Sequence, residues 1–260
     1  MNRQKIFNVV NKICNYLPTR KIPRLSRKYA ARILNLKDYS LSSGERQTSK
    51  TLDGIRVDHT ARYGVATDFL QKYFKNKPIK GYDVFCGIGY GAYMLSNAMP
   101  NATLEAIDGS DDAIKLAQKH YQTGRITFYQ KFFPFELSTV NADFFISLES
   151  IEHIEDDTTF LNLINKTLKP GGILIISTPN LEKWPLENNP NHFHYRHYKP
   201  SEFIQDIESK GFKLLYSFGQ NIYKMNKKGE IQGVLEDKDM EVKADYEGQN
   251  CIYIFQRNDE

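Results

Sequence analysis

Residues 83–91 read DVFCGIGYG, a glycine-rich stretch that follows a β-rich run and opens a helical pattern. Glycine lets the backbone approach a ligand closely, and the N–H groups at the start of the following helix point at that ligand. Asp108 ends the next β-rich run, 21 positions after Gly87. A carboxylate there can accept hydrogen bonds from both hydroxyls of an adenosine ribose. A tight turn followed by a helix-capping aspartate is the alternative, but the combination favours a nucleoside cofactor.

Working outward from this loop, short β-rich runs alternate with helical patterns from about residue 60 onward. Strands separated by crossover helices predict an α/β fold with a mostly parallel sheet and helices on both faces. Residues 169–172 (Lys-Pro-Gly-Gly) predict a turn after the third helix. Ligands bind such sheets beyond the carboxyl ends of the strands. The predicted strands are 79–85, 103–107, 126–129, 143–148, 172–177, 212–218 and 249–256, and the predicted helices are 90–98, 110–121, 157–168 and 200–209.

The composition is that of an ordinary globular protein. Hydrophobic residues make up 40% and charged residues 25% of the 260 positions, which excludes a disordered chain, a collagen-like repeat and a coiled coil. No apolar run approaches the roughly 20 residues of a membrane-spanning helix. Cysteines 14, 86 and 251 are spaced as neither a disulfide framework nor a zinc site. We therefore expect a reducing, cytoplasmic location.

Charge is distributed unevenly along the chain. Residues 1–50 contain 12 Lys and Arg residues against Asp38 and Glu45, a formal charge of +10 that leaves −6 for the rest. Apolar residues repeat at helical spacing in this region, which predicts a basic N-terminal helical extension over 1–50 and a main domain over 51–260. The extension either packs on the body or docks peripherally on a membrane's inner face or a lipid-linked substrate. Residues 220–248 are polar and predict a hairpin or lid insert.

Three further motifs follow the later strands: ESIEHIED at 149–156, LKPGG at 168–172 and ISTPN at 176–180. Together with the glycine loop, they make residues 58–220 resemble the class I S-adenosylmethionine (SAM)-dependent methyltransferases. The resemblance is strongest to ubiquinone-biosynthesis O-methyltransferases and to methyltransferases found with polysaccharide-building enzymes. It implies SAM as the cofactor and a Rossmann-like, seven-stranded sheet with an antiparallel last strand. Because the loop also fits the dinucleotide fingerprint G-x-G-x-x-G/A, an NAD-dependent oxidoreductase is the competing hypothesis.

The resemblance implies six cofactor contacts at Arg62, Asp83, Gly87, Gly89, Asp108 and Leu148. The arginine would pair with the SAM carboxylate, and the next three residues would line the methionine part. Asp108 would hold the ribose and Leu148 would back the cofactor.

Two positions depart from the family pattern. Phe85 stands where the family has its first loop glycine, so the path of the loop is in doubt. The acid expected near the adenine amine falls on Phe132. Adenine recognition would then depend on Gln130, on backbone groups or on stacking against Phe132.

Carboxylates and imidazoles gather in the loops where an acceptor must enter. Glu149, Glu152 and His153 follow the fourth predicted strand, and histidines 192, 194 and 197 follow the fifth. Such donors suit a divalent cation, for example Mg or Mn. Small-RNA ribose methyltransferases use an E-x-x-E-H motif as metal ligands, with a later histidine nine positions before the Phe of a Glu-Phe pair; His194 has this spacing.

The resemblance therefore gives Glu149, Glu152, His153 and His194 as metal ligands. In the metal-free alternative, the same segment supplies the catalytic residues. His153 or Glu149 takes the proton, and Glu152 lies beside them. The third possibility is that His153 only packs as a neutral imidazole.

Methyl transfer from a sulfonium requires an oxygen nucleophile held in line with the methyl group. A cation would favour two neighbouring hydroxyls, as in a sugar, ribose or catechol. The polysaccharide-associated branch predicts an O-methyltransferase acting on a sugar hydroxyl of a cell-surface glycan or its precursor. A quinone or phenolic small molecule is the second hypothesis, an RNA ribose 2′-hydroxyl the third, and a non-catalytic SAM-binding protein the last. We expect no specific nucleic-acid partner, because the body is acidic and lacks an evident aromatic platform.

Overall fold

A computed structural model describes residues 40–41, 46–138, 140–189 and 193–259 of the chain. The chain divides into two compact units, Met1–Glu45 and Arg46–Glu260. The basic extension predicted over residues 1–50 lies almost entirely outside the described residues, as does His192. The described helices and strands belong to the second unit.

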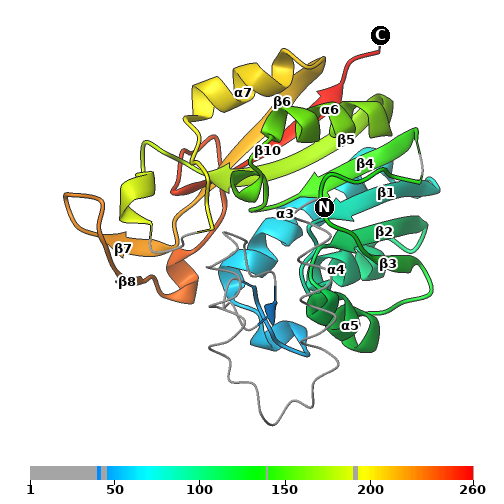
Figure 1. Ribbon diagram of the computed structural model, residues 1–260, viewed down its shortest axis with the longest axis horizontal. Helices are drawn as coiled ribbons and strands as arrows, with labels where there is room; N and C mark the ends of the chain where they lie inside the picture. The colour runs from blue at the N-terminus through cyan, green and yellow to red at the C-terminus, as the bar shows by residue number, and fades with distance from the viewer. Residues whose placement is uncertain (1–39, 42–45, 139, 190–192, 260) are drawn as a thin grey trace, which may run out of the picture. The chain divides into compact units, whose positions relative to one another are not determined.

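The second unit is built around a sheet with the strand order β3-β2-β1-β4-β5-β10-β6-β9 (Figure 1). Neighbouring strands from β3 to β5 run parallel, whereas β10 is antiparallel to both β5 and β6. This arrangement confirms the predicted Rossmann-like α/β fold. The strands are β1 (Ile79–Val84), β2 (Ala102–Asp108), β3 (Ile126–Gln130), β4 (Ala142–Ser147), β5 (Leu168–Pro179), β6 (Phe212–Gln220), β9 (Lys243–Ala244) and β10 (Asn250–Arg257).

The sheet has eight strands, so the expected number of seven is wrong. The additional strand, β9, pairs with Phe218 and Gly219 of β6. Gly219 permits the close approach of the chain there, because a Cβ atom at this position would lie 2.1 Å from the carbonyl oxygen of Tyr246. Since β9 has only two residues and both are exposed, it leaves no alternation of apolar residues that a sequence pattern could reveal.

Strand β5 begins earlier than the sequence indicates. Residues 169–172, predicted as a turn, lie within β5. Leu168 pairs with Ala142, and the register shifts before Phe144 pairs with Ile173. Gly171 has φ 71°, a left-handed conformation that such an irregularity favours. The Lys-Pro-Gly-Gly segment is therefore an irregularity inside the strand and not a turn that precedes it.

Helices cover both faces of the sheet (Figure 1). On one face, α6 and α7 share a core with Tyr82 and Val84 of β1. Asp83 lies between these two residues and therefore points to the opposite face, where it accepts a hydrogen bond from Tyr63 of α3. The helices are α3 (Val57–Phe74), α4 (Tyr90–Ala98), α5 (Asp111–His120), α6 (Asp157–Thr167) and α7 (Pro200–Glu208).

Side-chain caps fix the start of two helices at the carboxyl edge of the sheet. The hydroxyl of Ser110 accepts a hydrogen bond from the Ala113 N–H at 3.3 Å, at the start of α5. The carboxylate of Asp156 accepts one from the Thr159 N–H at 2.9 Å, at the start of α6. Each cap satisfies a backbone donor that has no partner within its helix. The helix start predicted at Ser110 follows from this chemistry.

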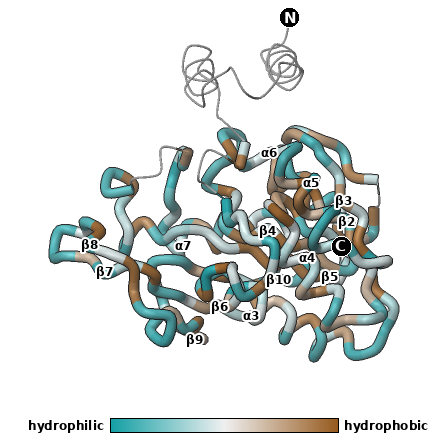
Figure 2. Tube along the Cα trace, turned by 90° about the horizontal axis from the view of Figure 1, so that it is seen from below, coloured by the Kyte–Doolittle hydropathy of each residue, from teal (hydrophilic) through white to brown (hydrophobic). Residues whose placement is uncertain are grey.

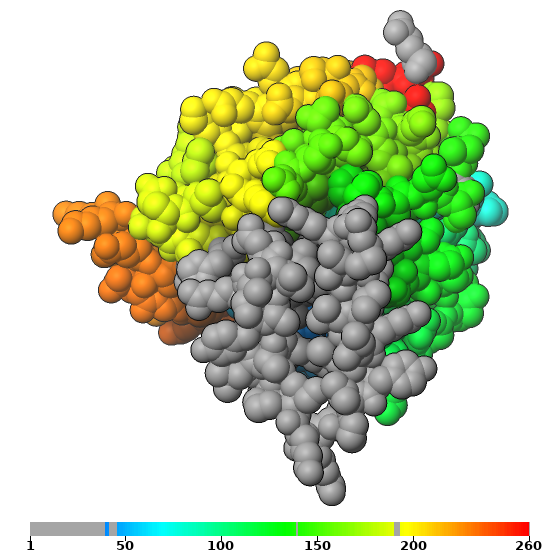
Figure 3. Space-filling view, viewed as in Figure 1, coloured from blue at the N-terminus to red at the C-terminus, as the bar shows by residue number. Residues whose placement is uncertain are grey.

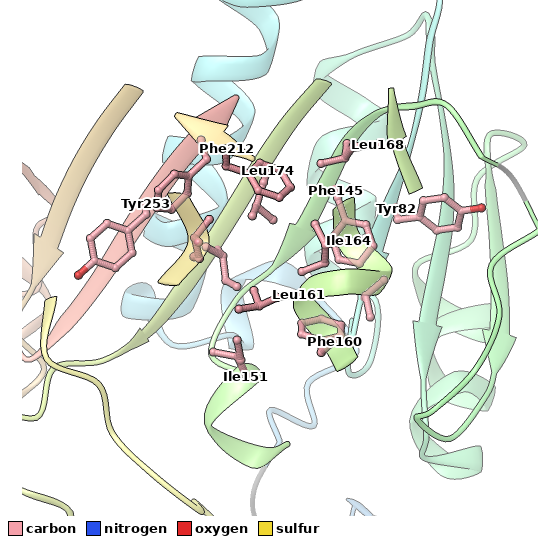
Figure 4. Packing of buried hydrophobic residues seen from close by; sticks show 14 of the residues in the cluster. Tyr82, Phe145, Ile151, Phe160, Leu161, Ile164, Leu168, Leu174, Phe212 and Tyr253 are labelled. Atoms are coloured by element: carbon pink, nitrogen blue, oxygen red, sulfur yellow. The ribbon is translucent and has the colours of Figure 1, made fainter. Parts of the chain in front are cut away.

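The core between α6 and the sheet is aromatic and aliphatic (Figure 4). Phe160 and Ile164 of α6 pack against Phe145 of β4 and Leu174 of β5, and all four side chains are fully buried. Burying a side chain of this size contributes about 1.5–3 kcal/mol. This packing holds the end of β4 and the start of α6 in place, and the Glu/His segment 149–156 lies between them.

Residues 220–248 contain a second, two-stranded sheet of β7 (Tyr223–Met225) and β8 (Ile231–Val234). This hairpin projects at one end of the unit, coloured orange in Figure 3. Figure 2 shows that its turn is largely hydrophilic. Short 3-10 helices complete the unit at η2 (Leu52–Gly54), η3 (Ile151–His153), η4 (Leu186–Asn188) and η5 (Asp237–Asp239). Within the described residues, no helix combines the length and apolar character that crossing a bilayer requires.

Candidate active site

The glycine loop connects β1 to α4 and contains three residues in the left-handed conformation. Phe85, Gly87 and Gly89 have φ values of 63°, 56° and 82°. A Cβ atom on Gly87 would meet no atom within 4 Å, whereas one on Gly89 would lie 2.6 Å from the ring of Phe128. The loop is therefore open beside Gly87 and tightly packed beside Gly89.

Phe85 resolves the doubt about the loop path. The residue keeps a left-handed backbone although it is not glycine, at a cost of about 1–2 kcal/mol. Its ring packs 5.4 Å from that of Phe160 and 6.4 Å from that of Phe133, on the α6 side of the sheet. The aromatic contacts offset the strain, so the loop takes the conformation that a glycine would give.

Asp108 lies at the end of β2 and binds the loop directly. Its buried carboxylate accepts hydrogen bonds from the N–H groups of Gly87 at 2.9 Å and Ser110 at 2.8 Å. The guanidinium of Arg46 donates a third at 3.2 Å. Sequence reasoning missed Arg46, because nothing distinguishes it from the other bases of the N-terminal region.

Gln130 is the last residue of β3, and Phe132 follows that strand. The Gln130 amide donates to the carbonyl oxygen of Gly109 at 2.9 Å. The ring of Phe132 approaches Gly109 so closely that a Cβ there would stand 3.0 Å from it. Both residues proposed for adenine recognition therefore lie beside the strand end that carries Asp108.

Asp83 is a buried carboxylate beneath the glycine loop. Its Oδ1 accepts a hydrogen bond from the Tyr63 hydroxyl at 2.9 Å, while Oδ2 has no hydrogen-bond partner among the described residues. Burial raises the pKa of Asp83 to about 7, against the effect of the Tyr63 hydrogen bond. A buried acceptor without a donor carries a cost that a bound cationic or N–H group would relieve.

Arg62 of α3 is almost completely buried, with 2% of its surface exposed. Its guanidinium donates to Gln220 at 2.7 Å and lies 3.6 Å from Asp58. Burial by itself raises the pKa of Asp58, but the charges of His59, Arg62 and Arg56 outweigh it and hold that pKa below its usual value. The hydrogen bond to Gln220, the last residue of β6, therefore holds the Arg62 guanidinium near the ends of the strands.

Glu149 and Leu148 follow β4, and the carboxylate of Glu149 is held by residues of β5 and β10. Its backbone is left-handed, at φ 51°. Its carboxylate accepts hydrogen bonds from the Ser177 hydroxyl at 2.7 Å and from the Asn250 amide. Burial raises the pKa of Glu149, and the charge of Arg62 opposes that rise. Leu148 is half-buried at the same strand end.

Glu152, His153 and His194 come together. Each offers one ligand atom, and these three atoms lie within 4.8 Å of one another. The His153 and His194 rings are 4.6 Å apart and nearly perpendicular, and His153 Nε2 lies 3.8 Å from Glu152 Oε1. Glu149 is not part of this group, so the described residues provide three of the four predicted metal ligands.

Backbone contacts join the two segments that carry this cluster. The Tyr195 N–H donates to the Glu152 carbonyl oxygen at 2.8 Å. His153 Nδ1 lies 3.2 Å from the carbonyl oxygen of Phe193. Because a carbonyl oxygen only accepts, Nδ1 donates in this contact, and in the neutral ring the lone pair then lies on Nε2. A nitrogen in that state can bind a cation or accept a proton.

Comparison with known proteins places this geometry in context. The family model described as "Methyltransferase domain" matches residues 75–239, more than half of the chain. The mitochondrial ubiquinone biosynthesis O-methyltransferase of Schizosaccharomyces pombe is 25% identical over 193 residues, which are 68% of this chain and 67% of that protein. That of Idiomarina loihiensis is 30% identical over 145 residues, 48% of this chain and 58% of that protein.

A probable SAM-dependent methyltransferase of Mycolicibacterium smegmatis is 26% identical over 136 residues, which are 52% of each chain. The chain thus spans about half the length of several of the curated relatives it matches. Among solved structures, magnesium protoporphyrin IX methyltransferase from Synechocystis with bound SAH gives a TM-score of 0.58 at 16% identity, covering 84% of this chain and 93% of that one. The methyltransferase domain of bacterial CtHen1-C gives 0.54 at 19% identity, covering 77% and 99%. Both structures share the fold.

Proposed function

The chain belongs to the class I SAM-dependent methyltransferases, and we propose that it is an O-methyltransferase whose acceptor hydroxyl stands beside a second oxygen. Membership of this family favours a methyltransferase over the two competing hypotheses, an NAD-dependent oxidoreductase and a non-catalytic SAM-binding protein. The residues at the carboxyl edge fit the cofactor. Gly87 leaves open space in the loop, Asp83 presents an orphaned buried acceptor, and Asp108 holds the loop in place.

We assign the cofactor contacts from this geometry. Asp83 and Gly87 suit the methionine part of SAM, because a buried carboxylate oxygen matches its ammonium group. Asp108 suits the ribose, with Gln130 and Phe132 beside the adenine. Arg62 suits the SAM carboxylate, with Gly89 and Leu148 shaping the pocket walls.

The observation that carries the proposal is the convergence of Glu152, His153 and His194. One carboxylate and two imidazole nitrogens suit a borderline divalent cation such as Mn²⁺ better than Mg²⁺, which prefers oxygen ligands. A bound cation would supply Lewis-acid chemistry that lowers the pKa of a coordinated hydroxyl. Two adjacent oxygens on the acceptor would complete such a three-ligand site.

The reaction breaks the S–CH₃ bond of SAM and forms an O–CH₃ bond on the acceptor. The acceptor hydroxyl loses its proton, and S-adenosylhomocysteine leaves as a neutral thioether. We assign His153 to take that proton, because its Nδ1 lies 3.2 Å from the carbonyl oxygen of Phe193, which leaves the lone pair of a neutral ring on Nε2. This role for His153 belongs to the metal-free alternative, in which Glu152 would stabilise the imidazolium that forms. With a cation bound, His153 would be a ligand and the hydroxyl proton would pass to water.

We propose a catechol-type or other phenolic acceptor, because several of the chain's relatives are named ubiquinone biosynthesis O-methyltransferases. A sugar hydroxyl in a glycan or glycan precursor is the second candidate. The side chain that favours it is Trp184, whose indole N–H is buried without a hydrogen-bond partner among the described residues. This N–H donor suits a hydroxyl group, whereas the ring face already packs against His197 and Tyr223.

The N-terminal region supports a proposal about location. Its 12 basic residues within positions 1–50 suit a peripheral contact with an anionic membrane face or a lipid-linked acceptor, in the cytoplasm. Specific binding of a nucleic acid is not part of the proposal.

Calorimetry with SAM and with NAD, followed by methyl transfer to catechols, sugar nucleotides, lipid-linked sugars and short RNA, tests the proposal. We expect SAM to bind and NAD not to bind. Among the acceptors, we expect catechols to be methylated fastest. Glu152→Gln should abolish the restoration of activity by Mn²⁺ after chelation, while Glu155→Gln, an exposed control three residues away, should not. Full activity of the wild type in chelator would leave His153 as the base; methylation of none of these acceptors would refute the proposal.

A further inference from the structure

A chain of imidazole contacts runs from the Glu/His cluster into the buried interior. His194 Nδ1 lies 2.8 Å from His197 Nε2. His197 Nδ1 lies 2.6 Å from the carbonyl oxygen of Trp184. His197 is 5% exposed, and its ring packs 5.0 Å from that of Trp184. The sequence placed this histidine among the candidate cation donors, but the spacing favoured His194 as the ligand.

The contacts determine where the protons of this chain sit. The Trp184 carbonyl oxygen can only accept, so His197 Nδ1 carries a proton. The Asn189 amide nitrogen can only donate, and it lies 3.4 Å from His197 Nε2, which therefore accepts. The proton between the two histidines then belongs to His194 Nδ1.

We propose that His197 is a positioning residue that fixes the tautomer of His194, so that the His194 lone pair lies on Nε2. This inference rests on the proposed function of the Glu152–His153–His194 cluster. His153 shows the same state through its contact with the Phe193 carbonyl oxygen. In both histidines, therefore, a partner accepts the Nδ1 proton, and the lone pair of the neutral ring lies on Nε2.

The partner of His194 Nδ1 differs from the usual partner of a ligating histidine. Ligating histidines ordinarily donate their second N–H to a carboxylate, a carbonyl oxygen or water, and this contact orients the ring. Here the acceptor is itself an imidazole, whose own tautomer is set by the Trp184 carbonyl oxygen. The orientation of His194 thus depends on the loop after β5 through two successive hydrogen bonds.

Two substitutions separate this role from simple packing. His197→Phe keeps an aromatic ring beside Trp184 but removes the acceptor. His197→Gln can place its amide oxygen near the former Nε2 position and so restores the acceptor. His120→Gln on α5, far along the chain from the cluster, is the matched control. The chain has six histidines, few enough for their ring nitrogens to be assigned individually.

The first test is nitrogen-15 NMR of the imidazoles in the full chain without added metal, above neutral pH. We expect His194 to show a protonated Nδ1 and an unprotonated Nε2 in the wild type and in His197→Gln. In His197→Phe, His194 should move to the other tautomer or to an average of the two. An unchanged His194 tautomer in His197→Phe would overturn the inference.

The second test is Mn²⁺ affinity, measured by electron paramagnetic resonance, with SAM affinity as the control. We expect His197→Phe to bind Mn²⁺ about 10- to 100-fold more weakly, and His197→Gln to recover most of this loss. SAM should bind all variants equally. If the wild type binds no Mn²⁺ while the NMR result holds, the cation part of the proposed function fails and the role of His197 stands. Equal Mn²⁺ affinity in the wild type and His197→Phe would overturn that role.

Discussion

Gly87 and Gly89 lie two positions apart in the same loop, but the structure predicts different consequences for the same substitution. Gly87 has φ 56° and open space where a Cβ would stand. In Gly87→Ala, the left-handed backbone costs about 1–2 kcal/mol, and no steric clash adds to it in the free protein. The new methyl group does, however, occupy space in which the cofactor would lie. Overlap of this kind costs about 1–3 kcal/mol, or about 5- to 150-fold in SAM affinity.

Gly89→Ala should act on stability first. Its Cβ would stand 2.6 Å from a ring carbon of Phe128 and 2.9 Å from the Cβ of Ala117. Overpacking then adds about 1–3 kcal/mol to the backbone strain. The free energy of unfolding should therefore fall by about 2–5 kcal/mol, more than in Gly87→Ala.

Urea unfolding without cofactor and calorimetric titration with SAM measure the two effects separately. Gly64→Ala is the control, because a Cβ at this position of α3 meets nothing within 4 Å. It should raise the unfolding free energy by about 0.5–1 kcal/mol and leave SAM affinity unchanged. If Gly87→Ala binds SAM as tightly as the wild type, the loop does not hold the cofactor, and the assignment of the site is refuted.

Three further substitutions test the carboxylates. Asp108→Asn places an amide N–H₂ against the N–H of Gly87 or Ser110, so SAM affinity in calorimetry should fall by about 10- to 100-fold. An affinity equal to that of the control Asp111→Asn, whose half-buried carboxylate pairs with Lys115, would contradict this. The pKa of Asp83 is about 7 in the folded protein against an ordinary 3.8. When folding raises the pKa of an acid, the folded protein loses stability as the pH rises and that acid ionises. Without SAM, the unfolding free energy should therefore fall between about pH 4 and pH 7 by at most about 4 kcal/mol, and Asp83→Asn should lack this component in urea titrations. Glu149→Gln should lower the unfolding free energy by about 1–3 kcal/mol and leave Mn²⁺ binding unchanged; loss of Mn²⁺ affinity would restore Glu149 to the ligand set.

The sequence predicts those parts of the fold that have a local chemical cause. Short apolar runs separated by helical patterns mark the buried parallel strands, and Ser110 marks the start of α5 because its hydroxyl caps the helix. Helix α3 was missed because its apolar residues are only weakly segregated to one face. Arg62 lies on this helix and has two partners. Asp58 is 4 positions away on the same helix, and Gln220 is 158 positions away at the end of β6. Only tertiary packing brings Gln220 to it.

The candidate site shows the same division between local and non-local causes. Residue types and their positions relative to the predicted strands indicate the glycine loop and Asp108, because few arrangements place a carboxylate at the end of the neighbouring strand. Nothing in the sequence shows that Arg46 reaches Asp108, since basic residues are frequent throughout the first 50 positions. The conformation of Phe85 was likewise beyond sequence reasoning, because its aromatic partners lie in separate segments.

The E-x-x-E-H motif shows why spacing alone does not assign roles. Glu149 and Glu152 are three positions apart, yet Glu149 is left-handed and its carboxylate is held by Ser177 and Asn250, on β5 and β10. It therefore ties the end of β4 to the two strands beyond it. Glu152 lies in the following 3-10 turn, where its carboxylate meets the histidines. The first carboxylate thus ties strand ends together, and the second lies with the histidines to which we assign the chemistry in our proposal.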